Sequence, residues 1–306
     1  MNRMSRRLFL QGAGGLALAT AGLGSYAVLF EPVLRLNVTS YRITPPRWPA
    51  GLTVKAAVLA DIHACEPWMP ASRVRGIANL ANDLDPDIIF LLGDFSGGHR
   101  FVTGPVMPEE WGESLSILKA PLGVYAVLGN HDWWHGPLPS MPADGAEGVR
   151  QALRFAGIEV LENESLRVSK DGQPFWVSGL GDQLGEFIGP RQTKSLADLP
   201  GTLAQVEGSA PIILLAHEPN IFRSIPDRVS LTLCGHTHGG QVNLPLTEDF
   251  VRRHFHVDHI YGHIVEKKRH MIISAGLGTS NVPVRFNRPP EIVHLTIGGA
   301  TVPSQS

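Results

Sequence analysis

Five short segments of the chain carry aspartate, asparagine and histidine, the side-chain types that bind metal ions and transfer protons. The segments are Asp61-Ile62-His63, Gly93-Asp94, Gly129-Asn130-His131-Asp132, His217-Glu218 and Gly235-His236-Thr237-His238. A single Asp-x-His or Gly-Asp would be ordinary turn chemistry. Here two rarer patterns, Gly-Asn-His and Gly-His-x-His, occur in one chain together with the others. We therefore interpret the five segments as parts of one site.

Each of these segments follows a short apolar run that is typical of a buried strand. The runs cover residues 54–60, 88–92, 123–128, 212–216 and 230–234. A helix is predicted after the first run, because Val74, Ile77, Leu80 and Leu84 recur at helical spacing before Asp85-Pro86-Asp87. Ligands of α/β sheets bind at the carboxyl ends of the strands, so we expect the five segments to converge there.

The rest of the chain predicts more helices and a second half rich in strands. Helices are expected around Trp111 and Val149, with a Pro/Gly-rich loop over 136–145 between them. Asp171-Gly172 separates two apolar runs and predicts a hairpin. The strands expected in this half cover residues 165–170, 174–180, 271–275 and 291–297. This order favours two packed sheets with helices outside them, in one domain over residues 51–300.

The five segments, taken in order, resemble the motif blocks of the calcineurin-like metallophosphoesterases. The chain is more narrowly similar to an exported bacterial phosphodiesterase branch of that family, through its N-terminus, through residues 235–241 and through the stretch from Pro283 to Glu291. The likeness covers roughly residues 50 to 297, and only Ala64-Cys65 after the first histidine departs from the usual small Gly or Ser. It implies a four-layer α/β/β/α sandwich of two mixed sheets, with a binuclear metal site at the strand carboxyl ends.

The resemblance also assigns roles to the residues of the five segments. It implies one metal ion held by Asp61, His63 and His238, a second held by Asn130, His217 and His236, and Asp94 bridging both. Such ligands suit Mn, Fe or Zn, and the absence of thiolates disfavours structural zinc. Two cations about 3.5–4 Å apart would acidify a shared water to hydroxide for attack on a phosphoester. His131 resembles the catalytic histidine that assists the leaving oxygen, and Asp132 either orients it or caps the following turn.

Several other residues have two interpretations each. Arg285 and Arg288 could grip phosphate or form salt bridges at the edge of the core. Trp133 and Trp134 could form an apolar wall beside a diester substituent or pack in the core. The histidines at 254, 256, 259, 263 and 270 fit no known metal spacing, and either cover the pocket or lie in solvent. Cys65 and Cys234, the only two cysteines, are expected as small buried residues rather than as a disulfide or metal ligands.

The N-terminal 30 residues are predicted to be a targeting segment. Three arginines lie within the first seven residues, and no charged residue follows until Glu31. Ser5-Arg6-Arg7-Leu8-Phe9-Leu10 resembles the twin-arginine signal, so the translocase of that route is an expected partner. Cleavage after Ala19-Thr20-Ala21 and retention as a membrane anchor are both open. Either outcome puts the catalytic part in the periplasm or on the outer face of the cytoplasmic membrane, with residues 31–50 as a linker.

Composition narrows the substrate but does not name it. The net charge is −2 and no long basic run occurs, which argues against nucleic acid as a partner. The favoured function is metal-dependent hydrolysis of a small-molecule or lipid phosphoester, most of all a phosphodiester. One alternative is cleavage of the diphosphate in a nucleotide-linked lipid precursor of the UDP-2,3-diacylglucosamine type, as in lipid A biosynthesis. The other is a non-catalytic metal-binding module, which the complete ligand set disfavours.

Overall fold

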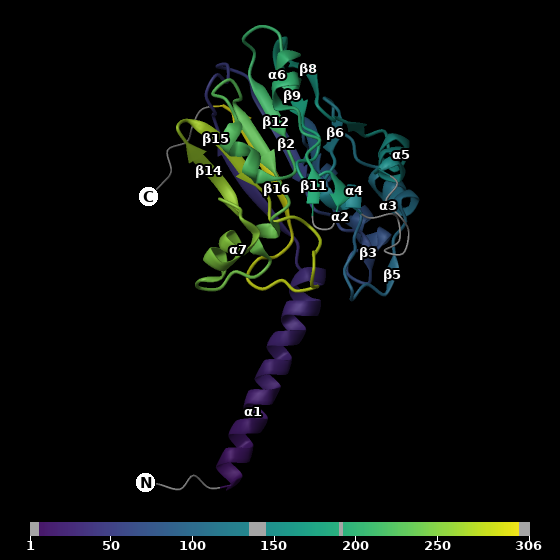
Figure 1. Cartoon of the computed structure of the whole chain (residues 1–306), viewed down its shortest axis with the longest axis vertical. Helices are drawn as coiled ribbons and strands as arrows, with labels where there is room; N and C mark the ends of the chain where they lie inside the picture. The colour runs from purple at the N-terminus through teal and green to yellow at the C-terminus, as the bar shows by residue number, and fades with distance from the viewer. Residues whose placement is uncertain (1–5, 135–144, 190–191, 300–306) are drawn as a thin grey trace.

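Two six-stranded mixed sheets pack face to face in the body of the protein. The computed structural model describes residues 6–134, 145–189 and 192–299 (Figure 1). The first sheet has the order β1 (Asn37–Ile43), β16 (Glu291–Gly298), β2 (Thr53–Leu59), β4 (Ile88–Leu92), β6 (Val124–Val127) and β7 (Glu159–Val160). The second has the order β14 (Gly262–Glu266), β15 (Arg269–Ile273), β13 (Leu231–Cys234), β12 (Ile212–Leu215), β9 (Gln173–Gly179) and β8 (Glu164–Lys170).

Strand β2 shows why the apolar runs of the sequence are continuous. Its alternate residues Val54, Ala56 and Val58 belong to the core between the two sheets, whereas Ala57 and Leu59 belong to the core under the outer helices. Both faces of the sheet are covered, so a polar residue on either face would lose its contact with water. The same alternation holds in β4 and places the inter-sheet core at the centre of the fold.

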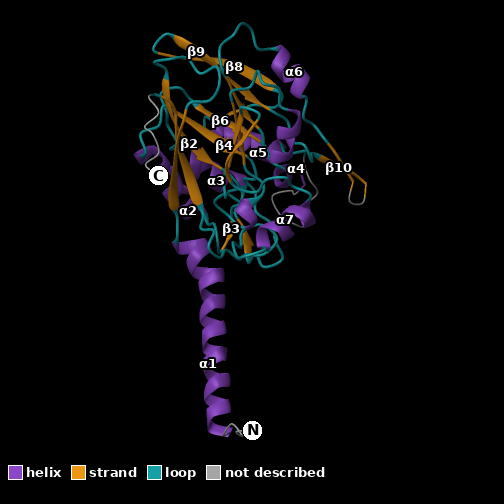
Figure 2. Ribbon diagram, turned by 90° about the vertical axis from the view of Figure 1, so that its left-hand side faces the viewer, coloured by secondary structure: helices purple, strands orange, loops and turns teal. Residues whose placement is uncertain are grey.

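Helices cover the outer faces of both sheets. The first sheet is covered by α2 (Ala71–Asp83), α3 (Pro108–Leu115) and α5 (Glu147–Phe155), and the second by α6 (Leu199–Ala204) and the 3-10 helix η2 (Pro219–Ser224). These layers are visible from two directions in Figures 1 and 2. The predicted α/β class and its four layers are therefore confirmed. The short elements are β3 (Cys65–Glu66), β5 (Gly104–Pro105), α4 (Asn130–Trp134), β10 (Glu186–Gly189), β11 (Gln192–Lys194), η3 (His238–Gly240) and α7 (Thr247–Phe255).

Parallel pairing brings the strand ends together at one edge. Strands β2, β4 and β6 run parallel in the first sheet, and β9, β12, β13 and β15 run parallel in the second. The predicted hairpin is confirmed: β8 and β9 pair antiparallel around Asp171-Gly172, whose φ angles of 52° and 74° are those of a tight primed turn. The loop predicted over 136–145 lies, except for Gly145, outside the described residues.

The N-terminal segment is a long helix that projects from the body (Figures 1 and 2). Helix α1 (Arg6–Ser25) continues as a π-helical stretch (Tyr26–Leu34), and Gly14–Leu34 is apolar and long enough to cross a membrane, with a mean hydropathy of 1.4. The prediction of a linker over 31–50 needs correction. Strand β1 pairs parallel with β16 at the edge of the first sheet, and Glu31 is fully buried. The segment that enters the sheet is therefore part of the domain.

Candidate metal centre

The structure brings all seven predicted metal ligands together at the carboxyl-end edge of the two sheets. Asp61, His63, Asp94 and His238 place one ligand atom each within 4.8 Å of one another. Asp94, His217 and His236 form a second group of the same kind, so Asp94 is shared. Asn130 joins the second group, because its Oδ1 lies 2.9 Å from Nδ1 of His236.

Distances within the two groups show that the ring nitrogens point at common centres. Oδ2 of Asp94 lies 3.3 Å from Nε2 of His63 and 3.2 Å from Nε2 of His217. Nε2 of His63 also lies 3.0 Å from Nε2 of His238, which in turn is 3.5 Å from Oδ1 of Asp61. Three imidazole nitrogens and two carboxylates facing one another in this way need cations or shared protons between them.

The donor set fits divalent cations. Oδ2 of Asp61 is buried and makes no hydrogen bond within the described structure, and the buried Nε2 of His217 faces the carboxylate of Asp94 at 3.2 Å. The other ring nitrogen of His217 faces the carbonyl oxygen of Leu92 at 2.5 Å, an arrangement that fixes the ring and leaves Nε2 for a metal. Burial by itself would be costly for such unpaired polar atoms, and a bound cation would remove that cost.

Electrostatic shifts in the centre have the pattern of a site that attracts positive charge. Burial raises the pKa of Asp61 to about 6. Burial would also raise the pKa of Asp94, but His217 and His131 hold it well below its ordinary value. Burial, and next His63, hold the pKa of His238 well below 6.5. A cation would stabilise both carboxylates in their charged form and would bind the neutral imidazole of His238.

The backbone of the ligand loops is strained, which the sequence pattern did not indicate. Five of the predicted ligands adopt a left-handed backbone with φ between 46° and 70°: Asp61, His63, Asp94, His236 and His238. Each such residue costs on the order of 1 kcal/mol, and such strain concentrates at functional sites. The neighbouring glycines leave no room for a side chain, since a Cβ at Gly129 would lie 2.4 Å from Oδ1 of Asp94.

Asp132 does more than cap the turn that follows it. Its carboxylate accepts hydrogen bonds from the backbone N–H groups of Asp94, Phe95 and Ser96, and from that of Gly129. The contact to Gly129 is a cap of α4, whereas the other three cross to the loop after β4. Asp132 therefore ties the loop of Asp94 to the loop of Asn130, a role that sequence reasoning missed.

His131 is half-buried beside the centre and is not among the grouped residues. Its ring packs edge-on against His63 with centroids 4.8 Å apart, and its Nε2 lies 3.3 Å from the hydroxyl of Ser280. Its backbone N–H donates to Oδ1 of Asp94. Sequence reasoning missed Ser280, because nothing in the local pattern marks a serine 149 residues away as its neighbour.

The two tryptophans take different positions. Trp133 packs against the core under the outer helices and has the guanidinium of Arg150 over its ring. Trp134 lies beside His131 at 5.7 Å between ring centroids and packs on Phe187 of β10 at 4.9 Å. Its indole N–H donates to the carbonyl oxygen of Gly185. Only Trp134 is placed to form an apolar wall beside the centre.

The two C-terminal arginines lie in different surroundings. Arg285 is fully buried, and its N–H groups donate to the carbonyl oxygens of Ala275, Gly278 and Arg288. Its guanidinium also lies 3.4 Å from Nδ1 of His238, so it lies behind that ligand and is not free to grip phosphate. The guanidinium of Arg288 lies over the ring of Tyr261 at 3.9 Å.

The later histidines and the cysteines lie outside the centre. His254 stacks on Phe250, His259 contacts Glu266, and His263 contacts His270. Within the described residues, the only groups of three or more His, Cys, Asp or Glu placed for a metal are the two that share Asp94. Both cysteines are buried and free, as expected.

Comparison with known proteins gives matches over most of the chain. A family model described as calcineurin-like phosphoesterase matches residues 54–267. An uncharacterized metallophosphoesterase of Aquifex aeolicus is 31% identical over 90% of this chain and 97% of its own length. The uncharacterized metallophosphoesterase YkuE of Bacillus subtilis is 29% identical over 97% of this chain and 99% of its own. The phosphodiesterase YaeI of Escherichia coli is 26% identical over 96% of this chain and 99% of its own.

Proposed function

Because the chain belongs to the calcineurin-like phosphoesterase family, we propose that it hydrolyses phosphodiesters at a centre that holds two divalent cations. The observation that carries this proposal is the sharing of Asp94 between two buried ligand groups. Two cations at short distance repel each other, and a carboxylate between them offsets that repulsion. Manganese, iron and zinc all suit the mixture of carboxylate, imidazole and amide ligands.

The residues of the centre divide the work of hydrolysis. When bound, the cations would lower the pKa of a water molecule and neutralise charge on the phosphate oxygens. Asp61, His63 and His238 would hold one cation, Asn130, His217 and His236 the other, and Asp94 both. His131, half-buried beside the centre, would protonate the leaving oxygen, and Ser280 would orient its ring through Nε2. Asp132 would keep the two ligand loops in register.

A diester suits the rim of the centre better than a monoester. A terminal phosphate carries an additional negative charge that cationic side chains usually neutralise. Arg285 is buried behind His238 and donates its N–H groups to backbone carbonyl oxygens, so it is not free to neutralise that charge. Trp134 and Phe187 present an apolar wall beside His131, where the second substituent of a diester would pack. The phosphodiesterase name of the E. coli relative supports the same class.

The test compares substrates under matched metal loading. Full-length protein is loaded with Mn, Fe or Zn, its metal content is measured, and kcat/KM is determined for bis(p-nitrophenyl) phosphate and p-nitrophenyl phosphate. We expect the diester to be favoured. Higher efficiency on the monoester would refute the substrate class, and cleavage of a nucleotide-linked lipid diphosphate in preference to both would support the alternative enzyme. If the protein binds stoichiometric metal but turns over none of these substrates, the result would support a non-catalytic metal-binding module.

The shared carboxylate is tested by Asp94→Asn. The neutral amide cannot offset two cations, so metal content and kcat/KM should fall together. The exposed Asp227→Asn is the matched control and should change neither. A variant that keeps two metals and full turnover would exclude Asp94 as the bridge.

Export by the twin-arginine route is proposed from the sequence and is tested separately. Replacing Arg6 and Arg7 by lysine keeps the charge but should leave the protein in the cytoplasm. Export that continues after this change would indicate another route. A folded-protein route would let the chain bind its metals before it crosses the membrane.

A further inference from the structure

Strand register places the metal centre at the same edge of the body as the apolar helix. Strand β1 begins at Asn37, directly after that helical segment, and runs parallel to β16, with Asn37 opposite Glu291. Strand β2 runs antiparallel to β16, with Val58 opposite Val293. The end of β2, which leads to Asp61, therefore lies at the edge where β1 begins. The other ligand-bearing strands of this sheet are parallel to β2, so they end at this edge too.

The end of the apolar segment is fixed to the loops around the centre. The backbone N–H of Arg285 donates to the carbonyl oxygen of Ala27 at 2.9 Å, and the indole of Trp68 donates to that of Val28 at 3.0 Å. The buried carboxylate of Glu31 accepts the backbone N–H groups of residues 287 and 288. These contacts set the orientation of the body relative to the helix, which is therefore more than a flexible tether.

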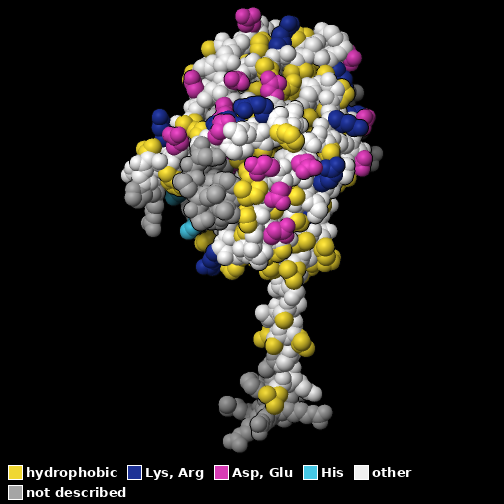
Figure 3. Space-filling model, turned by 90° about the vertical axis from the view of Figure 1, so that its right-hand side faces the viewer, with side chains coloured by type: hydrophobic (Ala, Val, Ile, Leu, Met, Phe, Trp, Pro, Cys, Tyr) yellow, Lys and Arg dark blue, Asp and Glu magenta, His cyan; other side chains and the backbone are white. Residues whose placement is uncertain are grey.

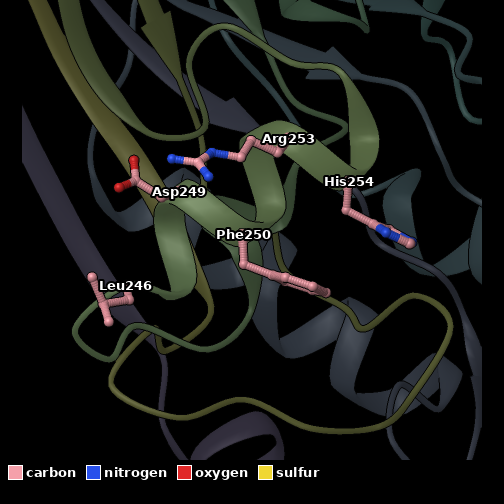
Figure 4. A pocket seen from close by; sticks show the side chains of 5 residues that line it. All are labelled: Leu246, Asp249, Phe250, Arg253 and His254. Atoms are coloured by element: carbon pink, nitrogen blue, oxygen red, sulfur yellow. The ribbon is translucent and has the colours of Figure 1, made fainter.

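Helix α7 lies at the same end of the body and presents an uncovered face (Figure 1). None of its residues is buried, and Leu246 and Phe250 are 81% and 64% exposed. Together with Asp249, Arg253 and His254 they line a shallow hollow, at the spacing of one helix face (Figure 4).

Helix α7 also adjoins the metal centre. It follows η3, which begins at His238, after a loop of only a few residues. A Cβ at Gly240 would come within 3.5 Å of Val251 of α7, so the helix packs over the residues next to this ligand. Whatever covers the exposed face of α7 therefore lies beside the centre.

Further apolar side chains surround the N-terminal helix at the point where it joins the body. Phe101 is 43% exposed, and it contacts His99, which packs on Trp68. Val282, in the loop that also carries Ser280, is exposed as well. Figure 3 shows hydrophobic side chains gathered where the helix joins the body. Together with the face of α7 they form the basal surface, defined here by Phe101, Leu244, Leu246, Phe250 and Val282.

We propose that the basal surface docks on the lipid bilayer that the apolar helix enters, and that the metal centre acts on phosphoesters whose apolar part stays in that bilayer. A water-exposed surface with this many large apolar side chains beside an apolar helix is what an interfacial protein presents to a membrane. Arg253, on the same face as Leu246 and Phe250, would meet lipid phosphates, with Asp249 beside it in the same hollow. The substrate half rests on the proposed phosphodiesterase function, whereas the docking half does not.

The docking is tested by a measurement that does not depend on enzymatic activity. It uses full-length protein in vesicles of phosphatidylcholine and phosphatidylglycerol. Leu246→Cys and Phe250→Cys carry a spin label, and Phe155→Cys, 74% exposed on α5, is the matched control. The two native cysteines are buried and should not compete for the label. We expect the labels at 246 and 250 to collide with lipid-soluble oxygen more than with an aqueous nickel complex, and the control to show the reverse. Equal water accessibility at all three sites would overturn the docking.

The substrate half is tested with two probes that share one reactive group. Hexadecyl p-nitrophenyl phosphate is placed in the vesicles, and ethyl p-nitrophenyl phosphate is supplied in solution. Phe250→Glu should lower the rate on the vesicle probe by about tenfold and change the soluble rate less than about twofold, because only the first needs the docked surface. Phe155→Glu should change neither.

The outcomes separate this inference from the function on which it rests. Equal effects of Phe250→Glu on both probes would overturn the proposal that the substrate stays in the bilayer, and would leave the proposed phosphodiesterase function standing. No hydrolysis of either probe by metal-loaded protein would refute the phosphodiesterase function itself, and the spin-label result would still decide the docking.

Discussion

Replacing Asp132 by asparagine tests whether two ligand loops are held together by one side chain. One carboxylate oxygen accepts the N–H groups of Phe95 and Ser96 at 2.8 and 3.3 Å, and the other those of Asp94 and Gly129 at 2.9 Å. The amide of asparagine would face two of these donors with an N–H₂ group. Two lost hydrogen bonds to a charged group cost about 3–6 kcal/mol in total.

Part of that cost is offset by burial. Burial, and next the charge of Asp94, raise the pKa of Asp132 to about 6, so the ionised form is disfavoured in the fold by a few kcal/mol. The neutral amide avoids this penalty. We therefore expect Asp132→Asn to lower the free energy of unfolding of the metal-free protein by up to about 3 kcal/mol at pH 7.5, above this pKa.

The same change should weaken metal binding. The backbone N–H of Asp94 is one of the four donors, so losing the brace lets the shared ligand move. Loss of such supporting contacts typically lowers metal affinity by about 10–100-fold. Activity should fall at limiting metal and recover largely when metal is in excess. Denaturant unfolding, metal titration and kcat at saturating metal measure the three effects.

A matched control is Asp198→Asn, which alters an exposed cap of α6 that accepts the N–H of Gly201. This variant should lose about 1 kcal/mol of stability or less and bind metal normally. The bracing role would be refuted if Asp132→Asn kept its stability and metal affinity but lost kcat with a shifted pH–rate profile. That result would mean that Asp132 acts through His131 instead.

Three further changes follow from the geometry of the centre. His131→Ala should keep the metal content and lower kcat by about 10²–10⁴-fold. If metal analysis of the purified variant shows that metal is lost, His131 is a ligand and not a proton donor. Burial raises the pKa of Asp61 to about 6, so below pH 6 a metal must displace its proton, and affinity measured by calorimetry should fall about tenfold per pH unit there. A flat affinity from pH 5 to pH 8 would contradict that. Trp134→Ala should lower the ratio of diester to monoester kcat/KM, because it removes the apolar side chain beside His131. Trp133→Ala should cost about 2–4 kcal/mol of stability and leave that ratio unchanged. Equal ratios in the two variants would refute the role of Trp134 as an apolar wall.

The strands and the convergence of the ligand segments could be predicted from sequence, because both depend on short-range patterns. Apolar runs such as Ile88–Leu92 are buried on both faces, so their composition alone marks them as central strands. Parallel strands put their ends at one edge whatever the details of packing. Asp61, Asp94 and Asn130 each follow such a strand, and their meeting required no knowledge of side-chain contacts.

Contacts between distant parts of the chain decided which polar side chains serve the centre and which serve the fold. Arg285 looks like a phosphate-binding residue in sequence, yet its donors go to carbonyl oxygens behind His238, 47 residues away. Adjacent tryptophans differ because Trp133 and Trp134 leave a short helix in different directions, one toward the core and one toward β10.

The sequence by itself therefore determined the family, the layers and the residue types that gather at the candidate metal centre, since each depends on residues close together along the chain. Tertiary structure alone decided the placement of the apolar helix against the centre. The carboxylate of Glu31 accepts N–H groups more than 250 residues later, and strand β1 joins a sheet whose other strands follow it in sequence. Such pairings leave no local pattern, because a buried carboxylate or an edge strand looks the same in sequence whichever partner it meets.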